Sequence, residues 1–274
     1  MAGGHTMSTM TMVASQTRYN LIASVRSGTS IAVGIVMPIV FFVGAAALFG
    51  SAALGGDMPV EVRGSGQTPD LRTFYVGGFM AYAIIYTAFV TLLPEVIEAR
   101  ESGFLKRLHG TPVRLSTYVA AKALIVLAMC SISVLVLMII ARFAFGIETR
   151  AAAIGGIALY VVLGSATFVA LAFGATSFVR NQSGAQGLSN ALGIGLALVS
   201  GVFFAPNLLP DAVQDVAQWL PLQPLANGFQ SLYVVGASGL SIDMRDVGVL
   251  VAWALVGVLA VAIRGFRWQP KLRR

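Results

Sequence analysis

Charged residues are scarce in this chain. Asp, Glu, Lys and Arg make up 11% of its 274 residues, whereas 57% are hydrophobic. A soluble domain averages about 25% charged residues, so these few charges cannot cover a globular surface of this size. The composition excludes an ordinary soluble protein and predicts an all-α integral membrane protein. At about 20 residues per membrane-spanning helix, the chain has room for six spans and no extramembrane domain of normal size.

Cysteine and histidine are nearly absent as well. Cys130 is the single cysteine and lies in an apolar segment, and the two histidines, His5 and His109, are far apart. This pattern excludes a disulfide framework and predicts no metal site. The sequence also contains no Gly-x-x-x-x-Gly-Lys-Ser/Thr phosphate loop. We therefore assign no catalytic residue and expect the chain itself to bind no cofactor.

Long hydrophobic runs are abundant, and they predict six membrane-spanning helices. The predicted spans cover approximately residues 31–54, 71–97, 116–141, 151–179, 185–204 and 244–263. The first run is too long for a signal-peptide core of about 7–15 residues, so we do not expect it to be cleaved. Residues 206–240 are too irregular for a plain connection and are expected to contain a short helix.

The remaining segments complete the predicted domain organisation. Residues 1–17 are expected to be disordered, 18–30 to form an interfacial helix, 31–267 to form the six-span domain and 268–274 to form a basic tail. With both termini cytoplasmic, thirteen of the eighteen Lys and Arg residues fall on the cytoplasmic side, as the positive-inside rule requires. The net charge of +7 then indicates contact with anionic lipid rather than with nucleic acid.

The most charged run of the chain is Glu98–Pro112, between the second and third spans. It predicts one helix that ends near His109, because a proline disfavours helical geometry at the residue before it. Phe104, Leu105 and Leu108 would give this helix one apolar edge. Two interpretations are open at this point: a solvated loop, or an amphipathic helix beneath the membrane that presses on a soluble partner.

The second span carries an aromatic stripe. Phe79, Tyr82, Tyr86 and Phe89 recur at steps of three and four residues and share one helix face. Such a face either packs against other helices or forms the wall of a substrate path, and the sequence leaves both open.

Two other membrane functions deserve comparison. Ser238, in a Gly-Ala-Ser-Gly run, superficially fits an intramembrane serine protease, but His109 would lie on the opposite side of the membrane. A nucleophile and its base must lie within about 3 Å of each other, so this function is excluded. Ion-coupled transport needs ionisable groups inside the spans, and Glu95 and Lys122 are the nearest such residues. That alternative stays open.

The charged run also resembles a known motif. The pattern Glu98-x-x-Glu101-x-Gly103-x-Leu105-x-x-Leu108-x-x-Thr111-Pro112 is similar to the cytoplasmic signature of ABC-2 type permeases, the membrane subunits of bacterial ABC exporters related to the daunorubicin-resistance permease. Phe104 stands where the family usually has Thr, and Lys106 where it usually has an acidic residue.

A second run resembles the same family. Ser200-Gly201-Val202-Phe203-Phe204-Ala205-Pro206, with the prolines that follow it, is similar to the end of the family's fifth span and its re-entrant outer helices. The resemblance extends over residues 18–267.

The resemblance implies a multi-pass protein of the bacterial cytoplasmic membrane. Two six-span permease subunits, as a homodimer or a heterodimer, would form the pathway, and two cytoplasmic ABC ATPase subunits that bind ATP and Mg would drive it. The charged run would be the coupling helix that docks on the ATPase, with Phe104, Leu105 and Leu108 as anchors. Its residues would be Glu98, Arg100, Glu101, Gly103, Phe104, Leu105, Lys106, Arg107, Leu108, Thr111 and Pro112.

In similar proteins the substrate path lies where the second and fifth spans meet. The residues expected to line it here are Tyr82, Tyr86, Phe89, Asn190, Phe203 and Phe204. Few charges among them favour a hydrophobic or amphipathic cargo, such as a drug, a lipid or a glycolipid. Phe203 and Phe204 are further expected to close the outer end of the path, the alternative being packing against lipid.

Overall fold

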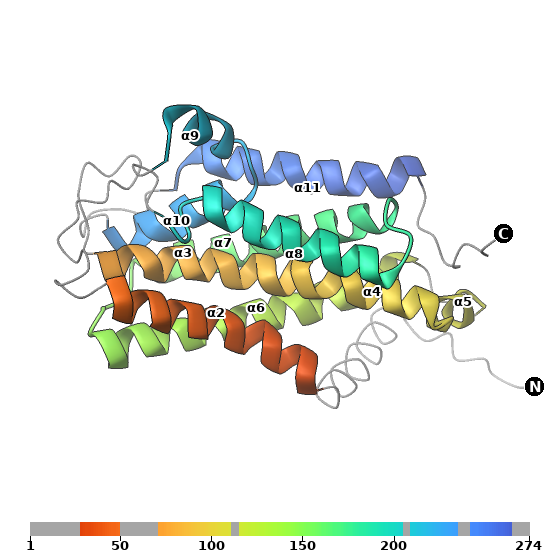
Figure 1. The fold of residues 1–274 in the computed structure, drawn as a ribbon, viewed down its shortest axis with the longest axis horizontal. Coiled ribbons are helices and arrows are strands. Elements are labelled where there is room, and N and C mark those ends of the chain that lie inside the picture. The colour runs from red at the N-terminus through yellow and green to blue at the C-terminus, as the bar shows by residue number, and fades with distance from the viewer. Residues whose placement is uncertain (1–27, 50–70, 111–114, 205–208, 235–241, 265–274) are drawn as a thin grey trace, which may run out of the picture.

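The residues that the structure describes form helices and no strand, and the long helices lie side by side (Figure 1). The structure is a computed structural model that describes residues 28–49, 71–110, 115–204, 209–234 and 242–264. The helices are, in chain order, α2 Gly28–Phe49, α3 Leu71–Ile85, the π-helix η2 Tyr86–Thr91, α4 Leu92–Glu101, α5 Phe104–His109, α6 Leu115–Phe145, α7 Ala153–Thr176, α8 Gln182–Val199, α9 Asp211–Ala217, α10 Leu222–Val234 and α11 Met244–Arg264.

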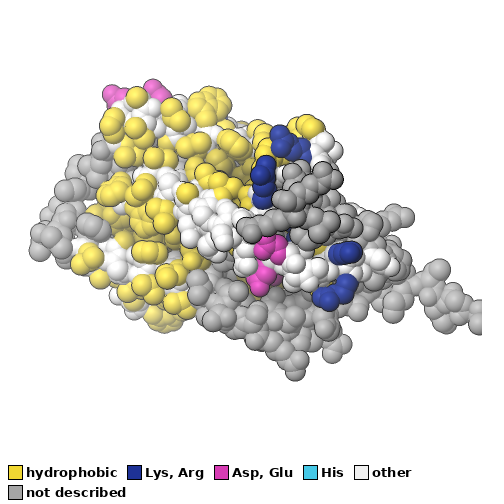
Figure 2. Space-filling model, turned by 45° about the vertical axis from the view of Figure 1, so that its right-hand side comes forward, with side chains coloured by type: hydrophobic (Ala, Val, Ile, Leu, Met, Phe, Trp, Pro, Cys, Tyr) yellow, Lys and Arg dark blue, Asp and Glu magenta, His cyan; other side chains and the backbone are white. Residues whose placement is uncertain are grey.

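The bundle has two different ends (Figure 1). One end, the α5 end, carries α5, the turn between α7 and α8, and the C-terminal end of α11. The opposite end, the α9 end, carries α9 and α10. Figure 2 shows hydrophobic side chains over much of the visible middle of the bundle, with the visible Lys and Arg side chains toward the α5 end. This distribution is typical of a protein whose middle faces lipid.

The core is built around one continuous rod, Leu71–Glu101, which consists of α3, η2 and α4. Its most apolar stretch is 89% buried, against 33% in α6 and 22% in α11. The rod contacts α2, α6, α7, α8 and α10. The second predicted span is therefore the central helix of the bundle, and the other helices surround it.

Within the part of the chain that the structure describes, four helices are long and apolar enough to cross a membrane. They are Leu71–Glu101, Ser116–Phe145, Ala153–Thr176 and Met244–Arg264. These confirm the predicted second, third, fourth and sixth spans as long apolar helices. The predicted first and fifth spans correspond to α2 and α8. The apolar part of α2, Gly34–Leu48, is shorter, and three polar amides in the first half of α8 lower its hydropathy.

Pro38 lies in the interior of α2 and removes the hydrogen bond that the carbonyl of Gly34 would otherwise accept. The hydroxyl of Thr87, on the π-helix, donates to that carbonyl at 3.5 Å. Neighbouring Ser and Thr side chains commonly compensate a proline in a membrane helix in this way. The carbonyl that Pro38 leaves without its helical partner is thus satisfied by a contact between α2 and the central rod.

Glycines allow several helices to pack with their backbones in contact. A Cβ atom at Gly257 of α11 would lie 2.4 Å from the carbonyl carbon of Ala170 in α7. A Cβ atom at Gly77 of α3 would lie 2.6 Å from the backbone nitrogen of Gln230 in α10. Small residues at such contacts are the usual means of close packing between helices in lipid.

Some predictions fall on residues outside those described. These are the disordered segment 1–17, most of the interfacial helix 18–30, Thr111 and Pro112 at the end of the charged run, Pro206, and the basic tail 268–274. The last residues of the predicted interfacial helix, 28–30, belong to α2. The third predicted span is longer than expected, because α6 continues to Phe145.

Candidate functional site

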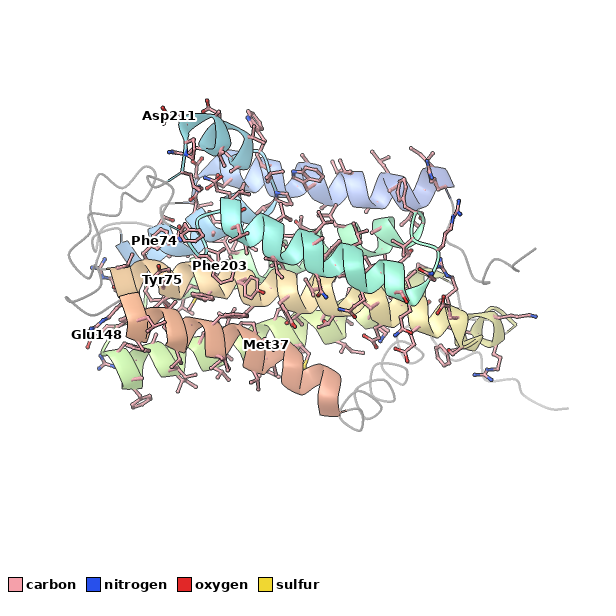
Figure 3. The ribbon with its side chains drawn as sticks, in the orientation of Figure 1. Met37, Phe74, Tyr75, Glu148, Phe203 and Asp211 are labelled. Carbon is pink, nitrogen blue, oxygen red and sulfur yellow. The ribbon has the colours of Figure 1, made fainter. Side chains whose placement is uncertain are left out.

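A groove of about 570 Å³ runs along the central rod between α2 and α8. Its lining residues are Met37, Phe41, Ala45, Tyr82, Tyr86, Val90, Asn190, Gly193, Ile194, Leu198, Phe203 and Phe204. The structure thus brings together five of the six residues that the sequence assigned to a substrate path, from three separate segments. Figure 3 shows two of the lining residues, Met37 on α2 and Phe203 beyond the end of α8.

Aromatic rings cluster around Phe203, at the part of the groove nearest the end of α8. The ring of Phe203 lies 5.8 Å from that of Phe41, 5.7 Å from that of Phe79 and 5.5 Å from that of Tyr82, centroid to centroid and in edge-to-face arrangements. Such pairs are favoured by the ring quadrupoles. Phe204, by contrast, is 47% exposed. Of the two phenylalanines predicted to close the outer end of the path, only Phe203 packs within this aromatic cluster, and the closing role itself stays a prediction.

Hydrogen bonds fix the backbone that carries Phe203. The side-chain nitrogen of Gln230, on α10, donates to the carbonyl of Gly201 at 3.0 Å, and both groups are buried. The hydroxyl of Tyr75 donates to the carbonyl of Phe203 at 3.4 Å. Gly201 itself has φ 72°, a left-handed conformation that favours glycine. α3 and α10 together hold the segment that follows α8 against the end of the groove.

None of the groove residues is Asp, Glu, Lys, Arg or His. The polar atoms of the groove come from the hydroxyls of Tyr82 and Tyr86 and from the amide of Asn190, which accepts a hydrogen bond from Gln186 at 3.2 Å. The groove thus offers a large apolar surface with a few uncharged hydrogen-bonding groups, which is the usual chemistry of a site for small apolar or amphipathic molecules.

The π-helix explains why Phe89 does not line the groove. In a regular α-helix, Phe89 would share a face with Tyr82 and Tyr86. The wider π-helical turn from Tyr86 to Thr91 places Val90 on the groove face instead, and Phe89 is buried elsewhere in the core. The hydroxyl of Thr91 donates to the carbonyl of Thr87 at 2.7 Å within this segment. π-Helical turns are often found at functional sites.

Sequence reasoning missed the wall that α2 contributes. Met37, Phe41 and Ala45 are spaced four residues apart and form one face of α2. The spacing marks a helix face, but nothing in the sequence indicates which neighbouring helix that face meets. The contact of α2 with the central rod supplies this information.

At the α5 end, the charged run forms two helices rather than the single helix predicted. Gly103 has φ 72° and separates α4 from α5. The left-handed conformation ends α4 because it cannot continue a right-handed helix, and glycine adopts it without steric cost. α5 is therefore a separate element of six residues, set at its own angle to the rod.

The predicted docking residues divide into exposed and buried ones. Phe104 is 41% exposed, and Lys106 and Arg107 are exposed. Leu105 is fully buried within the chain and Leu108 packs against the core. The sequence predicted Phe104, Leu105 and Leu108 together as anchors for the partner; Leu105 instead packs fully inside the chain and attaches α5 to the core, whereas Leu108 is only partly buried and its anchoring role stays a prediction. Phe104 is the large apolar side chain of α5 that faces outward.

Arg100 is also buried. Its guanidinium donates hydrogen bonds to backbone carbonyls at the end of α7 and in the α7–α8 turn, and 4% of the residue is exposed. Glu98 and Glu101 are exposed. Arg100 was predicted to belong to the docking surface, whereas its side chain faces inward.

Glu95 and Lys122, the residues considered for ion coupling, form an ion pair between α4 and α6. Lys122 is nearly buried and Glu95 is half exposed. The pair lies outside the groove, whose lining contains neither residue. Among the described residues, no group of three or more His, Cys, Asp or Glu side chains could hold a metal ion.

Comparison with known proteins identifies the family. A model of the ABC-2 family of transporter proteins matches residues 57–263, more than half of the chain. The chain belongs to the ABC-2 family of transporter proteins. The protein named "Putative transport permease YvfS", from Bacillus subtilis (strain 168), is 25% identical over 202 residues, which cover 70% of this chain and 78% of the relative.

Membership of the ABC-2 family makes the chain a transport permease subunit of an ABC transporter and not an enzyme. It also places the chain in a membrane, and it implies in general terms an ATPase partner. The matched residues of this ABC-2 permease contain the central rod, α5 and α8. The charged run and every lining segment of the groove except α2 therefore lie within the matched region.

Proposed function

We propose that this ABC-2 permease forms half of the pathway of an ATP-driven exporter. A second permease subunit supplies the other half, and two cytoplasmic ABC ATPase subunits, which bind ATP and Mg, dock beneath the pair. The observation that carries this proposal is the groove beside the central rod. It opens between α2 and α8, it is lined by aromatic and aliphatic side chains, and none of its lining residues is charged.

The cargo that fits this groove is a hydrophobic or amphipathic molecule such as a drug, a lipid or a glycolipid. A charged substrate would find no opposite charge to pair with in this apolar site, and an unpaired charge in such a site is costly. The hydroxyls of Tyr82 and Tyr86 and the amide of Asn190 supply hydrogen bonds for an uncharged polar group. The volume of about 570 Å³ is in the usual range for sites that hold drug-sized ligands.

The orientation we propose puts the α5 end in the cytoplasm of a bacterium. The described basic residues at this end are Arg100, Lys106, Arg107, Lys122, Arg180 and Arg264, against Glu95, Glu98 and Glu101. At the α9 end, acidic residues outnumber basic ones. The positive-inside rule favours a cytoplasmic position for the end with the excess of Lys and Arg.

In this orientation α5 is the docking element for the ATPase, and Phe104 is its apolar anchor. Glu98 and Glu101 of α4, with Lys106 and Arg107 of α5, surround it with exposed charges. α9 and α10 lie on the outer side, where the buried α10 helix enters the bundle from the α9 end, as expected for a re-entrant helix.

Purification tests the proposal. The chain is co-expressed with the ABC ATPase encoded by the adjacent gene, and the two are expected to co-purify. The complex is expected to hydrolyse ATP. The purified permease alone is expected to hydrolyse none. A permease that never binds an ATPase, yet accumulates or extrudes a lipophilic dye in response to an ion gradient, would support ion-coupled transport instead.

A further inference from the structure

The last turn of α4 carries two opposite charges that meet the ends of two other helices. Arg100 Nη1 donates to the carbonyl of Thr176 at 3.1 Å, and Nη2 donates to the carbonyls of Val179 at 2.8 Å and Arg180 at 3.0 Å. Thr176 is the last residue of α7. Carbonyls at the end of a helix have no partner within it, and the helix dipole there favours a cation. Arg100 therefore provides hydrogen-bond partners for carbonyls at the end of α7 and in the following turn, of which those of Thr176 and Val179 are buried.

Glu98 lies two residues earlier and meets the start of the next helix. Its Oε2 accepts a hydrogen bond from the side-chain nitrogen of Gln182, the first residue of α8, at 3.3 Å. The N-terminus of a helix favours an anion, so the order of charges on α4 matches the order of helix ends in the α7–α8 turn. We call Glu98, Arg100 and residues 176–182 the α4 clamp.

The clamp joins the docking element to one wall of the groove. On one side of it, α4 continues through Gly103 into α5, which buried Leu105 holds to the core. On the other side, α8 begins at Gln182 and contributes Asn190, Gly193, Ile194 and Leu198 to the groove. α4 and α8 are in direct contact along this path.

We propose that Arg100 is a positioning residue for transport: it makes the end of α4 and the start of α8 move together, so that displacement of α5 shifts the α8 wall of the groove. This role rests on the proposed function, in which an ATPase displaces α5. Arginine suits the role because its planar fork reaches three carbonyls at once, whereas lysine presents a compact charge without fixed geometry.

A close contact between the middle of α8 and the rod determines how a shift of the α8 start would change the groove. A Cβ atom at Gly193 would lie 2.6 Å from Val90 Cγ2, so α8 also touches the rod closely at the π-helix. With its middle held there and its start held by Arg100, a movement of the clamp tilts α8 about Gly193. The tilt changes the separation of α8 and α2, which form the two sides of the groove.

Spin labels on the two sides of the groove test this role without a known substrate. Cys130 is replaced by Ala, and labels are attached through Val40→Cys on α2 and Leu192→Cys on α8, both exposed positions. Labelled chain is diluted with excess unlabelled chain so that each complex holds one labelled copy. The distance between the labels is measured in the complex with the ATPase, without nucleotide and after trapping with ATP and vanadate.

The wild-type complex is expected to show a nucleotide-dependent shift in this distance. Arg100→Gln is expected to lose the shift while the complex keeps its ATPase subunits and hydrolyses ATP, and Arg100→Lys is expected to retain part of the shift. Arg264→Gln is the matched control: Arg264 stacks on Phe178 of the same turn from α11, with its Cζ 4.3 Å from the ring centre. This control is expected to keep the full shift.

The outcomes separate the clamp from the proposed function. If Arg100→Gln and Arg100→Lys both show the wild-type shift, Arg100 does not transmit the movement. If Arg100→Gln only lowers the yield of folded protein and Arg100→Lys shows the full shift, the hydrogen bonds serve folding alone and the proposal fails. If the wild-type chain binds no ATPase or shows no shift with nucleotide, the proposed function itself is overturned, and the transmitting role with it.

Discussion

Neighbouring side chains of α5 have opposite surroundings, and this contrast decides which of them can touch a partner. Phe104 is 41% exposed, whereas Leu105 is fully buried. Gly103 sets the contrast, because its left-handed backbone re-aims α5 relative to α4. A helix that continued straight from α4 would expose a different pair of residues.

We expect Phe104→Ala to weaken binding of the ATPase subunit. Truncating an aromatic anchor at an interface typically costs about 2 kcal/mol or more, which corresponds to a roughly thirtyfold rise in Kd. The measurement is titration of ATPase onto purified permease in lipid nanodiscs. Phe143→Ala is the control, since Phe143 is 85% exposed near the end of α6 that lies at the α9 end. Equal Kd values for the wild type and Phe104→Ala would remove Phe104 from the docking surface.

Leu105→Ala is expected to act differently. Removing a fully buried Leu side chain typically costs about 2–5 kcal/mol of stability through the lost contacts and the cavity. The permease alone should therefore unfold at a lower temperature, whereas Phe104→Ala should leave that temperature unchanged. Thermal unfolding of the two variants in the same detergent distinguishes them, and an unchanged unfolding temperature for Leu105→Ala would contradict its buried position.

Phe203→Ala is expected to open the end of the groove toward α9. Each aromatic pair of this ring is worth about 0.5–1.5 kcal/mol beyond area burial, and Phe203 makes such contacts with three rings. Loss of the closure should uncouple dye export from ATP hydrolysis in membrane vesicles. Phe204→Ala should have the smaller effect, because Phe204 is 47% exposed. Normal coupling in Phe203→Ala at normal expression would leave this ring a packing role only.

Among the helices, small residues determine how closely the elements approach. α7 and α11 touch through their backbones at Gly174 and Gly257. α2 and the rod meet where Pro38 frees a carbonyl for Thr87. The glycines lack a Cβ atom, so the facing backbone can approach them closely. Pro38 lacks an N–H, so the carbonyl left without a partner accepts a hydrogen bond from Thr87 instead.

Gly257→Ala is expected to destabilise the protein by about 1–3 kcal/mol, because overpacking a close contact forces the backbones apart. The added methyl group would lie 2.4 Å from the carbonyl carbon of Ala170. Gly248→Ala on the same helix meets nothing within 4 Å and should be neutral or slightly stabilising, since alanine is the better helix former. Thermal unfolding of both variants checks the difference in sign, and equal behaviour would contradict the close α7–α11 contact.

The described charged residues are distributed unequally between the two ends of the bundle. Six basic and three acidic described residues lie at the α5 end, whereas four basic and five acidic ones lie at the α9 end. Hydrophobic side chains cover much of the described surface between the two ends in the view of Figure 2. An anionic inner leaflet attracts the basic end, and this attraction favours one orientation of the bundle in the membrane.

Cysteine labelling tests that orientation. In a Cys130→Ala background, Ser102→Cys near α5 should react with a membrane-impermeant maleimide only after the cells are opened. Asp215→Cys on α9 should react in intact cells. Both positions are exposed, so access to the reagent decides the result. Labelling of Ser102→Cys from outside would invert the topology and would separate α5 from any cytoplasmic ATPase.

Several features of this protein follow from the sequence alone. The shortage of charge and the long apolar runs determine a helical membrane protein, because backbone polar groups in lipid must bond within their own segment. The Glu98–Pro112 run carries the resemblance to the family on local spacing. The aromatic residues Tyr82 and Tyr86 share a helix face because they are four residues apart, and they do line one groove.

Other features were decided only by tertiary structure. Periodicity placed Phe89 with Tyr86, but the π-helix put Val90 on that face. The charged run and its resemblance to the family placed Arg100 in the docking surface, but its side chain is buried and donates hydrogen bonds to carbonyls at and after the end of α7. The sequence could not show that Leu105 is buried and Phe104 exposed, because that difference depends on the left-handed backbone at Gly103. Local spacing determines which residues share a helix face, and only the packing of helices distant in sequence determines what that face meets.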